Sequence, residues 1–167
     1  MDKDNTDRKS IEDQLSKPLK RNRISSRKGF GGNMLPYLET WDVTERANQI
    51  FGHTGWSSQI DKLEVEQISS GEDGERARVM AYCIVTITLY KPIFADPLED
   101  GGNSHSGVGH GRGVSKSLED ASELAIKEAE SDARKRALKN FGDQFGNCLY
   151  MGAERLKSYS FGEETSD

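Results

Sequence analysis

Long apolar runs are missing from this sequence. No run of about eighteen apolar residues occurs anywhere in its 167 residues, and the N-terminal MDKDNTDRKS holds no apolar segment. A membrane-spanning helix needs such a run, and a secretory signal needs a shorter one. Both are therefore excluded by the sequence, and we expect a protein that works inside the cell without membrane contact.

Cysteine is also scarce. The two cysteines, Cys83 and Cys148, stand in unrelated contexts, and neither belongs to a C-x-x-C or C-x-x-H motif. The three histidines are not spaced with carboxylates in the way that a metal site requires. We therefore expect reduced, buried cysteines and neither a metal nor another cofactor.

An excess of positive charge is missing too, since 23 cations face 28 acidic residues and the formal net charge is −5. That balance argues against a nucleic-acid ligand, because such a protein must replace counterions along a phosphate backbone. The charge is nevertheless segregated. KPLKRNRISSRK, Lys17–Lys28, holds six cations and no acid, whereas Asp96–Asp100 and Gly162–Asp167 are acidic. The average therefore does not exclude a basic binding surface.

The N-terminal third predicts short elements. Ile11–Leu19 is compatible with a short helix, and Met34–Glu39 with an edge strand, because its proline removes one ladder donor. Apolar residues recur at helical spacing over Trp41–Phe51. This pattern predicts a helix with Thr40 as its N-cap and Gly52 as its stop.

Alternating apolar residues then predict three strands, Trp56–Ile68, Arg76–Tyr90 and a short one near Val108. SSGEDGE is a turn between the first two, and Lys91–Gly107 is predicted to be a long exposed loop because it holds prolines, acids and a Gly-Gly pair. GVGHGRG fits neither phosphate-loop pattern and is assigned to a tight strand and turn. The apolar positions of the first strand are Ile60, Leu63, Val65 and Ile68.

A long helix is predicted over Ser117–Phe141. Alanine recurs at every fourth position from Ala121 to Ala137, and Phe141 and Phe145 continue the same spacing. Small side chains on one helix face let the helix approach a sheet closely.

The segment DARKRALKNFGDQFGNCLY, Asp132–Tyr150, places four cations within six residues near the end of that helix. On a helical wheel, Lys135, Arg136 and Lys139 lie within about 100° of one another, roughly opposite the alanines. They can form a solvated helix end that complements the negative end of the helix dipole, or a surface that holds an anion. The helix alone leaves both interpretations open.

This segment resembles the signature of the Rad52 family of single-strand annealing proteins. Three further motifs are similar to that family and follow in its order: ISSRKGFGG (Ile24–Gly32), YLETWDVTERANQIFGHTGW (Tyr37–Trp56) and GVGHGRGVS (Gly107–Ser115). The resemblance covers about Ile24–Tyr150. Its strongest parts, ANQIFGHTGW and KEAESDARKRALKNFGDQFGNCLY, are long and unusual in residue choice.

The resemblance implies an α+β fold with a β-β-β-α core. In this fold a three-stranded antiparallel sheet packs on the long helix, and an N-terminal helix and a short strand flank the core. The strands and helix predicted above agree. The resemblance also implies an oligomeric ring with single-stranded DNA in a basic outer groove, and ATP-independent annealing of complementary strands in recombination and repair. Cations would hold the DNA backbone whatever the base sequence, and no enzymatic step is expected.

Five site residues follow from the resemblance by position. Lys135 and Arg136 resemble the family's inner-groove cations, and Lys139 stands where another basic residue is usual. Arg27 falls in the family-like ISSR motif. Lys91 lies near a lysine of a second, outer site in family members, where double-stranded DNA is a further ligand.

One departure from the family concerns Asp42, at a helix position where the family commonly carries a DNA-contacting cation. An acid there would repel phosphate. Arg46 lies one turn further along the same face, and we expect it to supply the missing charge.

Three regions are expected: a polar and basic segment (1–23), a DNA-binding and oligomerisation domain (24–155) and an acidic tail (156–167). The resemblance implies that eukaryotic members recruit a recombinase and a single-strand-binding protein through a long tail; we expect no such tail here, so these partners stay open. The compartment also stays open: the nucleus or mitochondrion in a eukaryote, the cytoplasm or nucleoid in a prokaryote or virus.

One other function stays open, and a second is disfavoured by the sequence. A ring-forming scaffold or partner-binding module with weak or no annealing would keep the fold, and Asp42 is compatible with it. A nuclease would need clustered carboxylates, but Glu128 and Asp132, one helical turn apart, have no evident third partner. Phe51 and Trp56 are assigned to the core rather than to base stacking.

Overall fold

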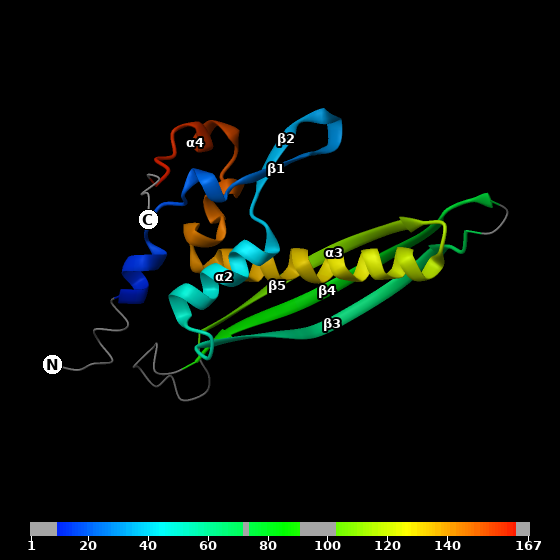
Figure 1. Ribbon diagram of the computed structural model, residues 1–167, viewed down its shortest axis with the longest axis horizontal. Coiled ribbons are helices and arrows are strands. Elements are labelled where there is room, and N and C mark those ends of the chain that lie inside the picture. Colours follow the sequence, from blue (N-terminus) through cyan, green and yellow to red (C-terminus); the bar gives the residue numbers. More distant parts are fainter. Residues whose placement is uncertain (1–9, 72–73, 91–102, 163–167) are drawn as a thin grey trace. The chain divides into compact units, whose positions relative to one another are not determined.

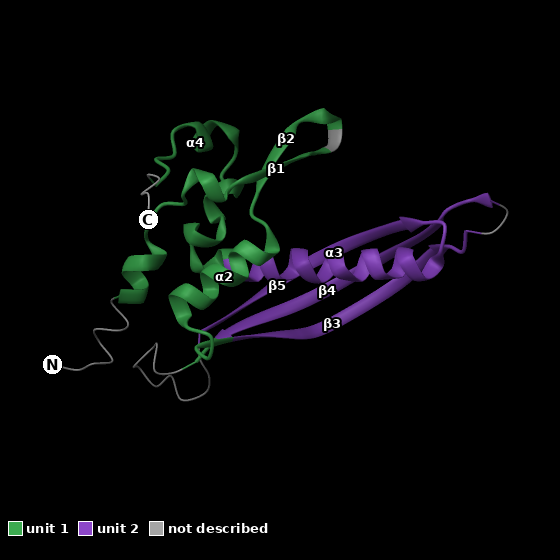
Figure 2. Cartoon of the chain, in the orientation of Figure 1, with its two compact units in different colours: residues 1–56, 89–102, 139–167 green, residues 57–88, 103–138 purple. Residues whose placement is uncertain are grey.

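The computed structural model describes residues 10–71, 74–90 and 103–162 (Figure 1). The chain forms two compact units (Figure 2). Unit 1 comprises residues 1–56, 89–102 and 139–167, and unit 2 comprises residues 57–88 and 103–138. Each unit buries apolar side chains of its own.

Unit 2 is a three-stranded antiparallel sheet with one long helix on one face (Figure 1). The strands are β3 (Trp56–Ser69), β4 (Ala77–Leu89) and β5 (Ser104–Ser115), with β4 in the centre, and the helix is α3 (Leu118–Leu138). Side chains of β4 alternate strictly between buried and more exposed positions, as expected for a strand with one covered face. The predicted three strands and long helix are confirmed.

The backbones of β5 and α3 lie in direct contact because both elements carry small residues there. The glycines of β5 at alternate positions face the alanines of α3, all of which are buried. A Cβ atom built on Gly109 would lie 2.3 Å from both the carbonyl oxygen of Ala129 and the backbone nitrogen of Ala133. No side chain fits at this distance, so the Gly-x-Gly repeat is a packing device rather than a phosphate loop.

Two boundaries and the exposure of one strand differ from the sequence predictions. β5 is a strand of 12 residues, so Ser104–Gly107 belongs to a strand and not to the predicted loop; residues 91–102 lie outside the described part. α3 ends at Leu138, and Lys139–Phe141 continues as a 3₁₀ turn. The apolar positions predicted for β3 are exposed by 40–51%, because the helix backbone lies against β5 and leaves β3 open: Ile60, Leu63, Val65 and Ile68.

Unit 1 combines short helices with a two-stranded hairpin. Residues 10–15 are helical, which confirms a short helix inside the predicted range. β1 (Ser25–Lys28) pairs in antiparallel fashion with β2 (Met34–Tyr37), and α2 (Thr40–Phe51) follows. The partner strand β1 escaped the sequence analysis because SSRK has no apolar alternation. The unit also contains 3₁₀ turns and a last short helix, which are Arg21–Arg23, Phe30–Gly32, Lys139–Phe141, Asp143–Phe145, Asn147–Tyr150 and α4 (Ala153–Lys157).

The core of unit 1 is built on three aromatic rings. Phe51 stacks on Phe145 at 5.7 Å between ring centroids and meets Phe141 edge-on at 5.6 Å. Phe51 is therefore a core residue, as predicted. The indole N–H of Trp56 donates a hydrogen bond to the side chain of Asn48 at 2.9 Å. These rings fix the C-terminal end of α2 against the turns that follow residue 139.

The two ends of α2 were predicted with unequal success. Gly52 stops the helix with a φ of 79°, a conformation that glycine adopts without strain, as predicted. Thr40 is already the first helical residue, so Thr40 is not the N-cap. The N-cap position is taken by Glu39, whose side chain makes no capping hydrogen bond.

Candidate nucleic-acid surface

Lys135 and Arg136 lie on the last turn of α3 in unit 2, away from the buried alanines. Arg136 is exposed, and its guanidinium Nε donates to the carboxylate of Asp132, one turn earlier, at 2.9 Å. A helical ion pair of this kind contributes little stability because solvent screens it, so the guanidinium can exchange its carboxylate for another anion. The structure thus presents these two cations on the polar face of the helix.

Two further predicted site residues lie in unit 1. The ammonium group of Lys139 lies 4.0 Å from the centroid of the exposed Tyr150 ring, and the guanidinium of Arg27 lies 5.6 Å from that of Tyr37. Both are cation-π contacts that hold a cation in place without neutralising it. Lys91, predicted for an outer site, lies outside the described residues.

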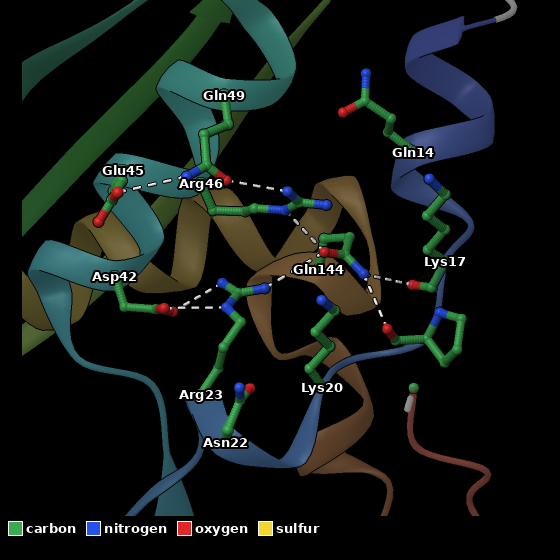
Figure 3. A pocket seen from close by; sticks show the side chains of 12 residues that line it. Gln14, Lys17, Lys20, Asn22, Arg23, Asp42, Glu45, Arg46, Gln49 and Gln144 are labelled. Atoms are coloured by element: carbon green, nitrogen blue, oxygen red, sulfur yellow. Dashed lines mark hydrogen bonds and ion pairs between the residues drawn. The ribbon is translucent and has the colours of Figure 1, made fainter. Parts of the chain in front are cut away.

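A polar pocket of unit 1 contains the remaining predicted residue, Arg46 (Figure 3). The pocket has a volume of about 760 Å³ and lies between α2, the segment that precedes β1, and the turn that carries Gln144. Arg46 and Asp42 enter it from α2, one helical turn apart. Arg46 and Asp42 therefore line the same pocket, as expected for two residues one turn apart on the same face of a helix.

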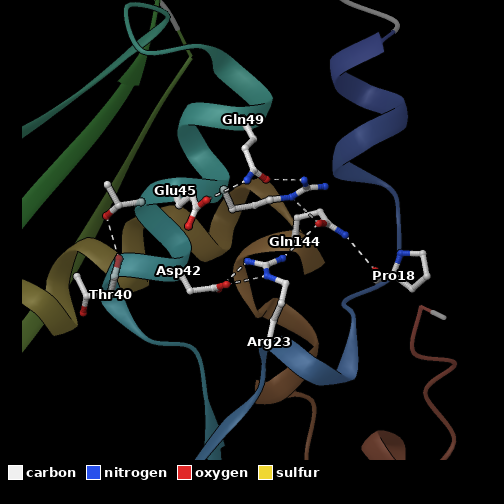
Figure 4. Close-up of polar contacts among 9 residues, drawn as sticks. Pro18, Arg23, Thr40, Asp42, Glu45, Gln49 and Gln144 are labelled. Carbon is white, nitrogen blue, oxygen red and sulfur yellow. Dashed lines mark hydrogen bonds and ion pairs between the residues drawn. The ribbon is translucent and has the colours of Figure 1, made fainter. Parts of the chain in front are cut away.

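Asp42 does not stand in the pocket as an uncompensated acid. Its two carboxylate oxygens accept hydrogen bonds from Nε of Arg23 at 3.0 Å and from Nη2 at 2.7 Å (Figure 4). Both side chains are at least 85% buried, so water screens this two-point ion pair only weakly. The negative charge of Asp42 is thus compensated within the protein.

Gln144 joins two guanidinium groups. Its side-chain oxygen accepts a hydrogen bond from Nε of Arg46 at 2.8 Å and another from Nη1 of Arg23 at 3.3 Å. Its amide nitrogen donates to the backbone carbonyls of Lys17 at 2.7 Å and Pro18 at 3.0 Å, which fixes the orientation of the amide. Gln144 is only 4% exposed and has partners for both its oxygen and its nitrogen.

Arg46 is held mainly by neutral groups. Besides Gln144, its guanidinium contacts the side-chain oxygen of Gln49 at 3.0 Å. Burial lowers the pKa of Arg46, the nearby charge of Arg23 lowers it further, and Asp42 acts in the opposite direction. The positive charge at Arg46 is therefore only partly compensated.

Sequence reasoning missed Arg23 and Gln144. Arg23 lies 19 residues before Asp42, and Gln144 lies 121 residues after Arg23, so neither contact follows from helical or strand spacing. The sequence does contain a signal for the Arg23–Asp42 pair. Arg23 belongs to the basic stretch that holds no acid, and Asp42 is the one acid in the first turn of α2.

The described residues also bear on other kinds of site. No group of three or more His, Cys, Asp or Glu side chains in this part of the chain is arranged to hold a metal ion. None of its helices is long and apolar enough to cross a membrane.

The chain is similar over most of its length to one family. The model of the Rad52/22 family of double-strand break repair proteins matches residues 7–165. The DNA repair and recombination protein rti1 of Schizosaccharomyces pombe is 39% identical over 133 residues, which cover 76% of this chain and 32% of that protein. Rad22 of the same yeast is 34% identical over 145 residues, which cover 84% and 28%. RAD52 of Saccharomyces cerevisiae is 33% identical over 141 residues, which cover 84% and 27%. The chain thus spans about a third or less of the length of these relatives.

Proposed function

Because the chain belongs to the Rad52/22 family of double-strand break repair proteins, we propose that it binds single-stranded DNA and anneals complementary strands without ATP. The observation that carries the proposal is the exposed Arg136 beside Lys135 on the polar face of α3. Cations on a rigid helix hold phosphates by charge, so binding depends on salt and little on base sequence. The bases stay available to meet a complementary strand, and no covalent bond changes.

The proposed DNA-binding residues are given for each unit by itself. Lys135 and Arg136 are the proposed contacts of unit 2, and Arg27, Arg46 and Lys139 are those of unit 1. Lys91 is proposed for an outer site that takes double-stranded DNA. A recombinase or a single-strand-binding protein is a further proposed partner, and the proposed place of action is on DNA inside the cell.

The proposed active form is an oligomeric ring. Support comes from unit 2, whose strands expose seven large apolar side chains by 38–51%. Large apolar side chains that stay exposed on strands can pack against a second copy of the chain, which is the cover that we propose. The seven side chains are Ile60, Leu63, Val65, Ile68, Met80, Val108 and Val114.

The proposal is tested by the rate at which two complementary, dye-labelled oligonucleotides anneal at low and at moderate salt. Wild type should accelerate annealing, and both Arg136→Ala and added salt should suppress the acceleration. Lys127→Ala is a matched control, because Lys127 lies on the same helix and pairs with an acid one turn earlier, Glu123, as Arg136 does with Asp132. The control should anneal as wild type does.

Native mass spectrometry of the same samples separates annealing from assembly. Rings that bind DNA weakly and do not accelerate annealing would overturn the proposal and favour the scaffold function. Equal losses in Arg136→Ala and Lys127→Ala would show that general charge, and not the proposed surface, acts on DNA.

A further inference from the structure

The pocket of unit 1 gathers more positive than negative side chains, although the whole chain is acidic (Figure 3). Arg46 enters from α2 and Arg23 from the turn before β1. Lys17 and Lys20 line it from the chain segment between the N-terminal helix and that turn. Two carboxylates, those of Asp42 and Glu45, face these four cations. The pocket therefore carries an excess of positive charge.

The carboxylates do not neutralise Arg46. Both carboxylate oxygens of Asp42 accept hydrogen bonds from Arg23. One oxygen of Glu45 accepts a hydrogen bond from the amide of Gln49 at 3.4 Å. Within the part of the chain that the structure describes, Arg46 makes no ion pair, and its hydrogen-bond partners are the neutral amides of Gln49 and Gln144.

The two guanidinium groups are held close together because they share one acceptor, the side-chain oxygen of Gln144. Like charges at this distance repel each other, and an anion bound between or beside them relieves the repulsion. Burial lowers the pKa of Arg46, and the nearby charge of Arg23 lowers it further. A guanidinium carries five N–H donors, and Arg46 uses two in its contacts with the two amides, so donors remain for a ligand.

We infer that this pocket holds a backbone phosphate of bound single-stranded DNA, with Arg46 as its main ligand and Lys17 and Lys20 on the facing wall. The inference rests on the proposed function and adds a phosphate site and two ligands to it. Arg23 acts as a positioning residue, because Asp42 neutralises it while it fixes Gln144.

The chemistry of the pocket favours the DNA backbone over the bases. The described residues that line it include no aromatic side chain, so no ring is present on which a base could stack. The lining offers cations and amides, which suit phosphate oxygens. The volume of about 760 Å³ is larger than one phosphate needs, so the sugars that flank it can also enter. Binding here should not depend on base sequence.

The test measures the affinity of the full chain for a fluorescent oligothymidylate by anisotropy at several salt concentrations. Arg46→Gln should weaken binding several-fold and lower the slope of log affinity against log salt by about 0.7 for one lost phosphate contact. The double variant Lys17→Gln/Lys20→Gln should act in the same direction. This second variant keeps the inference testable if Arg46→Gln fails to fold, because Lys17 is exposed and Lys20 only partly buried. Lys157→Gln is the control, since Lys157 is 73% exposed on α4 and does not line the pocket.

An oligothymidylate with uncharged methylphosphonate linkages identifies the bound group. Wild type and Arg46→Gln should bind this probe equally weakly, because the phosphate charge on which Arg46 acts is missing. A remaining difference between the two proteins would overturn the inference, since Arg46 would then act on another part of the strand.

Three results separate the inference from the proposed function. If wild type does not bind the oligothymidylate at all, both fail. If Arg136→Ala weakens binding while the pocket variants bind as wild type does, the function stands and the pocket is not a DNA site. The inference also fails if inorganic pyrophosphate raises the melting temperature of wild type but not of Arg46→Gln while both proteins bind DNA equally, because the pocket is then a small-anion site.

Discussion

The guanidinium of Arg23 and the carboxylate of Asp42 face each other through two hydrogen bonds of 3.0 and 2.7 Å, in side chains that are only 15% and 13% exposed. Arg23 lies just before β1, and Asp42 lies in the first turn of α2. The pair therefore ties the N-terminal segment to the helix. From the sequence, Asp42 is expected to repel DNA phosphates, but in the structure Arg23 compensates its charge.

Asp42→Asn should lower the free energy of unfolding by about 1–3 kcal/mol, because the largely buried guanidinium of Arg23 loses its charged partner. The measurement is urea unfolding followed by circular dichroism. The exchanged pair Arg23→Asp/Asp42→Arg should recover part of the loss. If Asp42→Asn is as stable as wild type, the ion pair contributes nothing net.

Gly109→Ala should destabilise unit 2 by more than about 3 kcal/mol. The new Cβ would lie 2.3 Å from backbone atoms of Ala129 and Ala133, and helix backbone cannot move aside as a flexible side chain can. Val108→Ala is the matched control: Val108 is the preceding residue, is 46% exposed and should have a small effect. Thermal unfolding of both variants checks this, and a Gly109→Ala protein that melts near wild type would contradict the close packing.

Local patterns allowed much of the fold to be predicted. The alanine spacing identified α3, and alternation identified β3 and β4, because these periods are properties of single elements. The extent of β5 was missed because a strand of alternate glycines has no apolar alternation. β1 was missed because it is polar on both faces. In each case the partner element, which the sequence does not show, decides the structure.

The candidate site was predicted less completely than the fold. Single residues such as Lys135 and Arg136 were identified from a charge cluster and a family resemblance. The pocket around Arg46 needs Arg23 and Gln144, which are brought in by chain segments far apart in sequence. Such tertiary contacts have no period, so composition and spacing could suggest Arg46 but not its partners.

Residues 24–155 alone, the proposed DNA-binding and oligomerisation domain, should be less stable than the full chain. Leu19 is fully buried in unit 1, and burial of such a side chain contributes about 1.5–3 kcal/mol. The deletion would also remove Arg23, which pairs with Asp42, and the backbone carbonyls that accept hydrogen bonds from Gln144. It would further remove Tyr159, whose hydroxyl donates a hydrogen bond to Asp143. Urea unfolding of 24–155, 10–162 and the full chain measures the difference. Equal stability of 24–155 and 10–162 would show that the flanking residues do not belong to the folded unit.

The two cysteines should report on the two units separately. Cys83 in unit 2 and Cys148 in unit 1 are fully buried, and burial raises the pKa of both thiols. A raised pKa lowers the fraction of reactive thiolate, so neither thiol should react with Ellman's reagent at pH 8 in the native protein. With increasing urea, two separate steps of one equivalent each would mean that the units unfold independently. A fast reaction without urea would contradict the burial of that cysteine.

Tyr159 should make the protein less stable at alkaline pH. Its hydroxyl accepts a hydrogen bond from the backbone N–H of Leu19 at 3.0 Å and donates one to Asp143 at 2.9 Å. Burial raises the pKa of Tyr159 well above its ordinary value of 10.0, and the contact with the Asp143 carboxylate adds to the rise. Below pH 10 the phenol is neutral in both states, so its contribution to folding is fully present. As the pH rises above 10, the unfolded chain releases this proton while the folded protein retains it, which favours unfolding.

Tyr159→Phe should therefore be less stable than wild type at pH 8, because the Leu19 N–H loses its acceptor, yet should lose less stability between pH 10 and 12. Urea midpoints across this range give the comparison, and Tyr150→Phe serves as the control because Tyr150 is 58% exposed. The quantity to compare is the difference between the stability curves of wild type and Tyr159→Phe across this pH range, because it isolates the contribution of Tyr159. Parallel curves for wild type and Tyr159→Phe would mean that the phenol of Tyr159 ionises equally easily in the folded and unfolded chain, and that its contacts with Leu19 and Asp143 do not hold its proton.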